Sequence, residues 1–178
     1  MKQIQILVAV LGMFSLNGVL SAGEMLDIKG NFGELKNGLP AGWYPNKPRY
    51  WEDTATISLS EIPETGKFAL KVTSQSQTIH IFSILGTSPK KWPITTGGQC
   101  IIKAKIKGHG EGGLGVYSYP SGQFQGKDFQ ATEEWTEFIA ELTMGVTKPE
   151  VEEICIVLMI GPGASVEFSD VTAEIVAN

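Results

Sequence analysis

The sequence predicts an all-β protein, a sandwich or barrel of about nine short strands that follows an N-terminal signal peptide. Two observations lead to this fold class. After the first 22 residues, apolar and β-branched runs are separated at short intervals by Gly, Pro and Asn, which is typical of strands joined by turns. The same part of the chain lacks convincing helical periodicity.

The first segment, residues 1–22, has the layout of a secretory signal peptide. Lys2 precedes an apolar stretch over 4–16, and the helix-breaking pair Asn17-Gly18 is followed by the small residues Ser21 and Ala22. The apolar stretch is shorter than the roughly 20 residues that span a bilayer, so a permanent anchor is the weaker interpretation. We therefore expect cleavage near Ala22 and an exported protein that is secreted, periplasmic or at the cell surface, without a membrane span after processing.

The remaining residues, 23–178, are numerous enough for one domain and too few for two. The whole chain has 14 basic and 19 acidic residues; removal of Lys2 leaves 13 basic against 19 acidic, a formal charge of -6. An acidic domain without a basic run has no electrostatic footprint for nucleic acid or for an anionic membrane. These two classes of partner are excluded as main hypotheses.

Nine runs have the composition of strands. The clearest alternation is over 102–107, where Ile102, Ala104 and Ile106 should face inward and three lysines should face solvent. In chain order the predicted strands are 55–60, 68–74, 78–85, 99–108, 115–119, 136–143, 153–160, 165–168 and 171–176.

The glycine-rich segment 108–113 fits the G-x-G-x-x-G pattern of dinucleotide sites. The sequence after it, from Leu114 to Tyr119, continues as a strand and does not open the helix that would hold a pyrophosphate. We therefore predict a flexible hairpin turn at 108–113, with glycines that adopt positive φ.

Catalytic patterns are weak. The two histidines, His80 and His109, stand in no metal-binding or triad motif, and the acidic pairs at 133–134 and 152–153 are chain neighbours that would face opposite sides of a strand. If Ile79 and Ile81 face the core, His80 and Phe82 face outward, either on a ligand-binding sheet or simply on an exposed sheet face.

The aromatic residues are more suggestive of function. Trp43, Tyr44, Tyr50 and Trp51 crowd one Gly- and Pro-containing segment, and Tyr117 shares a strand face with Tyr119. Sugar rings present apolar C-H faces that pack on flat aromatic side chains. Core packing is the competing explanation, which we favour for Trp43 and Trp135 and leave open for the two tyrosines.

Cys100 and Cys155 are the two cysteines of the chain. Each lies in the apolar phase of a predicted strand, so two inward thiols could meet across the core, and export would permit a disulfide between them. The alternative is two separate buried thiols that behave as small apolar residues.

Several segments together resemble jelly-roll carbohydrate-binding modules of the family 4/9/22 type, in the galactose-binding-domain-like superfamily. The N-terminal part of the resemblance lies in 31–34, 38–43 and 66–72. The later part lies in 97–108, which resembles the central strand ending in Lys-Gly, in 131–135 with its strand-opening Trp, and in 166–171. The resemblance covers nearly all of 23–178 and implies a single jelly-roll β-sandwich.

The resemblance also implies a structural calcium ion. Such modules hold calcium between the N-terminal segment, the turn before the second strand and a late Asp, which suggests Glu34 and Asp170 as side-chain ligands here. The order Phe32-Gly33-Glu34 departs from the usual Phe-Glu pair, and Ser169 stands where the first Asp of the late pair is expected.

These observations predict a non-catalytic module that binds a glycan or polysaccharide. Two alternatives are a structural or protein-interaction domain of the cell surface or periplasm, and a small glycoside hydrolase or lyase with two facing carboxylates. The residues expected to contact the glycan are Tyr117, Tyr119, His80, Phe82, Tyr50 and Trp51, with hydrogen bonds from Gln123, Gln125 and Asp128.

Overall fold

The structure, a computed structural model, describes residues 23–33, 35–36, 39–45, 55–85, 88–145 and 151–176. Within these ranges there are strands and turns and no helix, so the predicted all-β class is confirmed. None of the described residues forms a helix with the length and apolar character needed to cross a membrane. The predicted signal peptide over 1–22 lies outside the described residues and stays a prediction.

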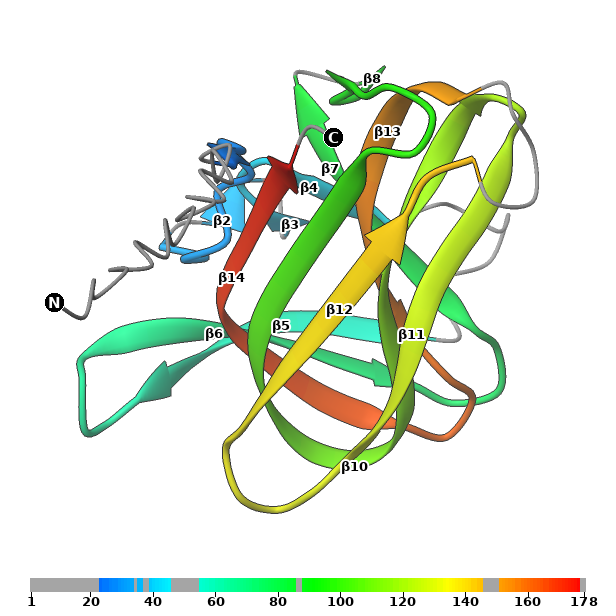
Figure 1. Cartoon of the computed structure of the whole chain (residues 1–178). Helices are drawn as coiled ribbons and strands as arrows, with labels where there is room; N and C mark the ends of the chain where they lie inside the picture. Colours follow the sequence, from blue (N-terminus) through cyan, green and yellow to red (C-terminus); the bar gives the residue numbers. More distant parts are fainter. Residues whose placement is uncertain are drawn as a thin grey trace, which may run out of the picture.

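Twelve strands form one antiparallel hydrogen-bonded network that folds over into the two layers of a jelly-roll sandwich (Figure 1). Two further strands, β2 and β3, pair only with each other. The described strands are β1 (Glu24–Met25), β2 (Leu35–Lys36), β3 (Leu39–Pro40), β4 (Trp43–Pro45), β5 (Ala55–Ile62), β6 (Lys67–Ser74), β7 (Ile79–Leu85), β8 (Ser88–Pro89), β9 (Trp92–Pro93), β10 (Gln99–Pro120), β11 (Gln123–Ala131), β12 (Thr136–Thr143), β13 (Val151–Ile160) and β14 (Ser165–Val176).

Strand β10 belongs to both layers. Its first half, 99–109, pairs with β12 on one side and β14 on the other, and β14 continues to β6 and β5; we call this layer the first sheet. Its second half, 110–120, pairs with β11 and β13, and β13 continues to β7 and β4; this layer is the second sheet. The layers therefore share one long, curved strand (Figure 1).

The hairpin turn predicted at 108–113 is wrong, because this segment lies inside β10 and joins the predicted strands 99–108 and 115–119. Its glycines permit the strand to bend between the layers. Gly108 has a φ of +133°, and a Cβ there would lie 2.1 Å from the carbonyl oxygen of Ser165; Gly110 has a φ of +89°, and a Cβ would lie 2.6 Å from that of Ala164.

Two further differences concern strands. The predicted strands 165–168 and 171–176 form the single strand β14, with a register shift opposite Lys103–Lys105 beside Asp170, whose φ is +50°. Strand β11 was not expected, because its sequence from Gln123 to Ala131 is mostly polar and is interrupted by Gly126.

The core lies between the layers and contains the residues that alternation placed there. Ile102, Ala104 and Ile106 are buried, whereas Lys103 and Lys105 are exposed and Lys107 is half-buried, as expected. Trp43 is 1% exposed, packs its ring 5.7 Å from that of Phe32, and donates from Nε1 to the carbonyl of Lys29 at 3.2 Å. The core position expected for Trp43 is confirmed.

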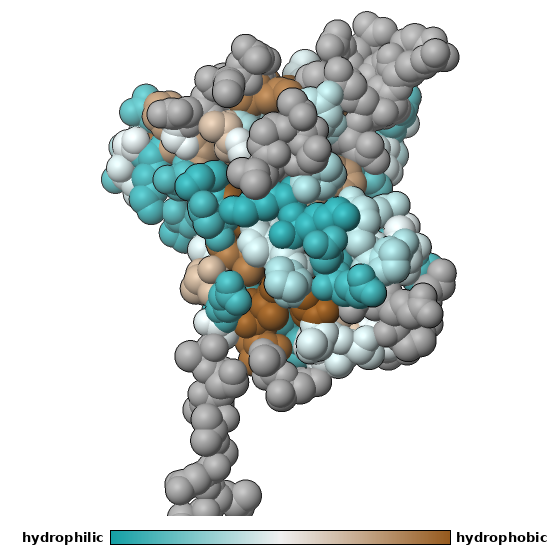
Figure 2. Space-filling view, turned by 90° about the horizontal axis from the view of Figure 1, so that it is seen from above, coloured by the Kyte–Doolittle hydropathy of each residue, from teal (hydrophilic) through white to brown (hydrophobic). Residues whose placement is uncertain are grey.

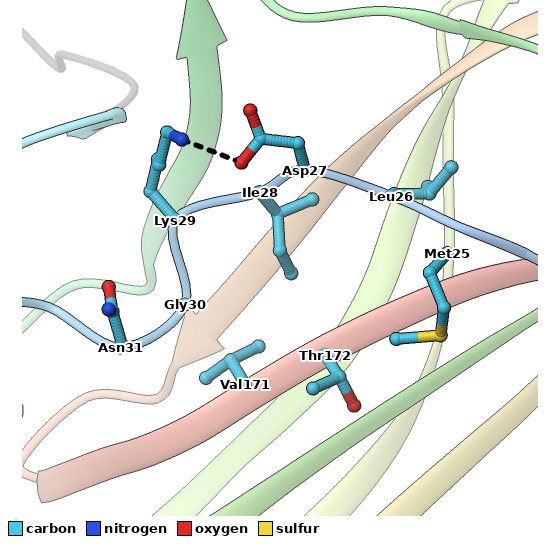
Figure 3. A pocket seen from close by; sticks show the side chains of 9 residues that line it. All are labelled: Met25, Leu26, Asp27, Ile28, Lys29, Gly30, Asn31, Val171 and Thr172. Atoms are coloured by element: carbon cyan, nitrogen blue, oxygen red, sulfur yellow. Dashed lines mark ion pairs between the residues drawn. The ribbon is translucent and has the colours of Figure 1, made fainter.

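The N-terminal segment 23–33 runs beside β14 and is tied to it by backbone hydrogen bonds, from Leu26 N to the Ala173 carbonyl at 2.8 Å and from Val171 N to the Gly30 carbonyl at 3.0 Å. Between the segment and β14 is a shallow pocket of about 310 Å³, with the Asp27–Lys29 ion pair on its outer side (Figure 3).

Seen from above, the surface of the molecule has hydrophilic residues across its middle and apolar residues beside them (Figure 2).

Candidate aromatic binding face

The outer side of the second sheet carries a group of five aromatic side chains, which we call the aromatic face: His80, Phe82, Tyr117, Tyr119 and Phe124. Alternation along β7 puts Ile79 and Ile81 in the core and turns the side chains between and after them outward. The outward position predicted for His80 and Phe82 is therefore confirmed.

Strand register brings the members together. Tyr117 of β10 is directly opposite Phe124 of β11 on one side and Cys155 of β13 on the other. Phe82 of β7 is opposite Val157 of β13. Since directly paired residues in an antiparallel sheet share a face, all four strands contribute to one surface.

The rings are in mutual contact. The centroids of Phe82 and Tyr117 are 5.9 Å apart in an edge-to-face arrangement, and those of Tyr117 and Tyr119 are 5.4 Å apart at 60°. The rings of His80 and Phe124 are stacked at 5.4 Å. Phe82 is nearly buried, whereas His80, the tyrosines and Phe124 are half-exposed, so the face offers apolar ring surface together with polar edges.

Glycines make room for the ring of Phe124. A Cβ at Gly115 or at Gly126 would lie 2.7 Å from an atom of that ring. The Phe124 ring therefore lies down on the sheet, where side chains at these two positions would prevent it, and this position lets it reach His80.

Charged groups stand at the ends of the aromatic face. At one end the Lys91 ammonium lies 3.9 Å from the centroid of the Tyr119 ring and pairs with the Glu153 carboxylate at 3.1 Å. At the other end, Asp128 of β11 is exposed and is opposite Gly113 of β10, which alternation places on the same face as Tyr117. Asp128 is thus placed where it could accept hydrogen bonds from a ligand hydroxyl.

Burial shifts the proton equilibria of two members. Desolvation lowers the pKa of His80, which favours the neutral imidazole at pH 7. The pKa of Tyr119 is raised, first by burial and then by the neighbouring Cys155, Tyr117 and Glu153. Both side chains are therefore neutral hydrogen-bonding groups on this face at neutral pH.

Two of the remaining predicted ligand contacts do not lie on the aromatic face. Gln123 and Gln125 are paired with Ser118 and Val116, on the opposite side of β11 from Phe124. Gln125 donates from Nε2 to the Thr143 carbonyl at 3.1 Å. Tyr50 and Trp51 lie outside the described residues.

The two cysteines are separate buried thiols, which is the second of the two alternatives that the sequence left open. Cys100 lies in the core side of the first sheet, whereas Cys155 is on the outer side of the second sheet, beneath Phe82 and Tyr117. Strand β13 is apolar on both faces, and Ile154 and Ile156 lie on its core side. The alternation of apolar residues therefore could not predict on which side of the sheet the Cys155 side chain lies. Burial raises the pKa of Cys100 to about 12 and that of Cys155 to about 11.

Asp170 is the one expected calcium ligand among the described residues, and two lysines engage it. The two carboxylate oxygens of Asp170 contact the ammonium groups of Lys67 at 2.8 Å and Lys105 at 3.2 Å, and these lysines lower its pKa. No group of three or more His, Cys, Asp or Glu side chains in the described part of the chain could hold a metal ion. Glu34 lies outside the described residues, and calcium stays a prediction.

Two members of the site were missed from the sequence. Phe124 lies in β11, which was not predicted, and Lys91 lies in a loop without periodicity. The pattern Tyr117-x-x-Pro120-x-Gly122-x-Phe124 contains the available signal, because a Pro- and Gly-containing turn between two aromatic-bearing segments is typical of a hairpin.

No protein-family model and no curated protein matches the sequence. Solved structures with the same fold were found at low sequence identity. A Stig cyclase from Fischerella sp. TAU, in complex with (3Z)-3-(1-methyl-2-pyrrolidinylidene)-3H-indole, is 11% identical with a TM-score of 0.65, over 88% of this chain and 100% of that one.

Carbohydrate-binding modules also share the fold. The CBM22-1 xylan-binding domain from Paenibacillus barcinonensis is 12% identical with a TM-score of 0.53, over 89% of this chain and 98% of that one. The CBM22-1-GH10 modules of a Clostridium thermocellum endo-1,4-beta-D-xylanase, complexed with xylohexaose, are 17% identical with a TM-score of 0.51, over 86% of this chain and 28% of that one. The jelly-roll fold predicted from the resemblance is confirmed.

Proposed function

We propose that this protein is an exported, non-catalytic module that binds a polysaccharide on its aromatic face. The observation that carries the proposal is the contact between the rings of Phe82, Tyr117 and Tyr119 on the outer side of the second sheet. The rings of the two tyrosines are half-exposed. Aromatic rings in this state can pack against the C-H faces of sugar units while neighbouring polar groups bond the hydroxyls.

The polar groups around the rings suit an uncharged, hydroxyl-rich ligand. His80 is neutral at pH 7, Lys91 and Glu153 neutralise each other, and Asp128 supplies acceptor oxygens at the far end. The fold likeness to carbohydrate-binding modules supports the proposal at the level of fold alone.

The experiment is a glycan-array screen of residues 23–178, followed by affinity measurements with the best polysaccharide for the wild type and three variants. Tyr117→Ala and Tyr119→Ala should each weaken binding about tenfold, because the loss of one ring contact removes roughly 0.5–1.5 kcal/mol beyond its buried area. Phe68→Ala is the matched control, since Phe68 is an exposed aromatic residue of the first sheet.

Three outcomes would contradict the proposal. If the folded wild type binds no glycan, the structural or protein-interaction alternative gains support. If polysaccharide is cleaved or a small indole-type substrate is converted, the protein is an enzyme; the cyclase of the same fold makes this assay necessary. Equal losses in Phe68→Ala and Tyr117→Ala would argue against the aromatic face as the site.

A further inference from the structure

A second candidate site lies on the other layer. A groove of about 280 Å³ crosses the outer side of the first sheet, between the β5–β6 turn and the start of β12. We call it the Trp135 groove; its lining residues are Ile62, Glu64, Thr65, Lys105, Trp135, Glu137, Ser169 and Asp170. The aromatic face is built on the second sheet, so the groove is a separate surface.

Trp135 is not in the core, which corrects its expected position. Its side chain is half-buried, and it lines the groove together with Ile62 from the end of β5. The groove thus combines apolar surface with polar and charged groups, and its volume is just below the ~300–1,000 Å³ range of small-molecule pockets, which suits a ligand of a single ring.

Ser169 provides an observation that is independent of the acidic residues. It is only 1% exposed, and its hydroxyl has no hydrogen-bond partner among the described residues. Ser169 is directly opposite Lys105 in the β10–β14 ladder, and Lys105 faces outward, so the Ser169 side chain faces the groove that both residues line. A buried hydroxyl without a partner costs free energy, and a ligand in the groove could satisfy it.

The groove carries unpaired negative charge. Asp170 is already paired with Lys67 and Lys105. Glu64 and Glu137 also line the groove, and neither has an ion pair within the described residues, although Glu137 is directly opposite Lys105 in the β10–β12 ladder. The three carboxylates Glu64, Glu137 and Asp170 against the two lysines Lys67 and Lys105 leave an excess of one negative charge. These two carboxylates favour a ligand with a positive charge.

We propose that the Trp135 groove binds one amino-sugar unit, a hexose ring that carries a protonated amine. The indole of Trp135 packs against the ring's C-H face, the Ser169 hydroxyl bonds a sugar hydroxyl, and the carboxylates of Glu64 and Glu137 attract the ammonium group. The proposal does not depend on the polysaccharide site of the second sheet.

The test is an NMR titration of the ¹⁵N-labelled domain with three matched sugars, D-glucosamine, N-acetyl-D-glucosamine and D-glucose, at about pH 6, where an aliphatic amine is protonated. Glucosamine should bind at least about tenfold more tightly than the other two, since only it carries the charge. The Trp135 indole N-H resonance should shift, whereas that of Trp43, which is buried and bonded to the Lys29 carbonyl, should not.

Variants separate this site from the aromatic face. Trp135→Ala should abolish the glucosamine response, and Glu137→Gln, which keeps the side-chain shape, should reduce the preference for glucosamine over glucose severalfold. Tyr117→Ala should leave glucosamine binding unchanged. Equal affinity for the three sugars, no shift at Trp135, or loss of glucosamine binding in Tyr117→Ala would each overturn the proposal.

Discussion

The ring of His80 is stacked on the ring of Phe124, with centroids 5.4 Å apart and planes inclined by 22°. The two residues lie in β7 and β11, and β13 and β10 separate these strands within the second sheet. The stacked pair therefore connects the two outer strands of the aromatic face across the two strands between them. Because the imidazole is half-buried, its protonation is coupled to the stability of the sheet.

This coupling gives a pH dependence with a definite sign. Desolvation sets the pKa of His80 in the folded state below its unfolded value of about 6.5. Above about pH 6.5 the imidazole is neutral in both states, and its contribution to stability is fully present. As the pH falls from there through the folded-state pKa, the unfolded state takes up the proton first, and stability is lost.

We therefore expect the Tm of the wild type to decrease between about pH 7.5 and pH 5.5, above the range where most carboxylates titrate. The variant His80→Gln, which cannot be protonated, should show a flatter profile in the same buffers. Parallel profiles for the two proteins would contradict the assignment to His80. Glycan affinity should also decrease as the pH falls, because protonation of His80 would put a positive charge on the aromatic face.

Replacement of Gly110 should destabilise the bend of β10. Gly110→Ala places a Cβ 2.6 Å from that of Ala164 in a backbone conformation with φ of +89°, so we expect a loss of about 1–3 kcal/mol in the free energy of unfolding. Urea denaturation measures the change. Gly33→Ala is the control, because a Cβ there meets nothing within 4 Å; its effect should stay within about 0.5 kcal/mol.

The thiols should be unreactive in the folded protein. Both cysteines are buried, and burial raises the pKa of Cys100 to about 12 and that of Cys155 to about 11, which leaves little thiolate at pH 8. Ellman's reagent should react slowly with the native protein and with two thiols after denaturation, with or without prior reduction. Fewer than two thiols in denatured, unreduced protein would reveal a disulfide.

Calcium should have little effect on the fold if Asp170 stays paired with its two lysines. We expect the Tm in millimolar calcium to equal the Tm in a chelator, and Lys67→Ala to lower the Tm modestly, because Asp170 keeps one partner. A rise in Tm of several degrees with calcium would show instead that the folded protein binds the ion, as the resemblance implied.

Much of the fold followed from local pattern, as the strand over 99–108 illustrates. There, alternation identified Ile102, Ala104 and Ile106 as core residues, and burial agrees. Alternation failed where a strand has no single polar face: β13 is apolar on both sides, so Cys155 was assigned to the wrong one. It failed again in β11, where pairing with β10 stabilises a strand of weak propensity.

The candidate site was partly predictable for the same reason. Alternation within a single strand is a short-range property. It predicts that the side chains of His80 and Phe82 face outward and that Tyr117 and Tyr119 share one face. That β7 and β10 are brought together by β13 depends on long-range pairing. Phe124 enters the site through the pairing of β11 with β10, and Lys91 precedes β9, which pairs with β13; no local pattern specifies either pairing.

Strand β10 has a further consequence for how the molecule comes apart. Since one strand supplies hydrogen bonds to both layers, neither layer can detach without exposing half of β10 and its unpaired amides. The domain should behave as a single cooperative unit, in which the central amides of β10 exchange with solvent only through global opening. A change that destabilises the aromatic face should therefore also reduce the protection of the first-sheet amides from hydrogen exchange.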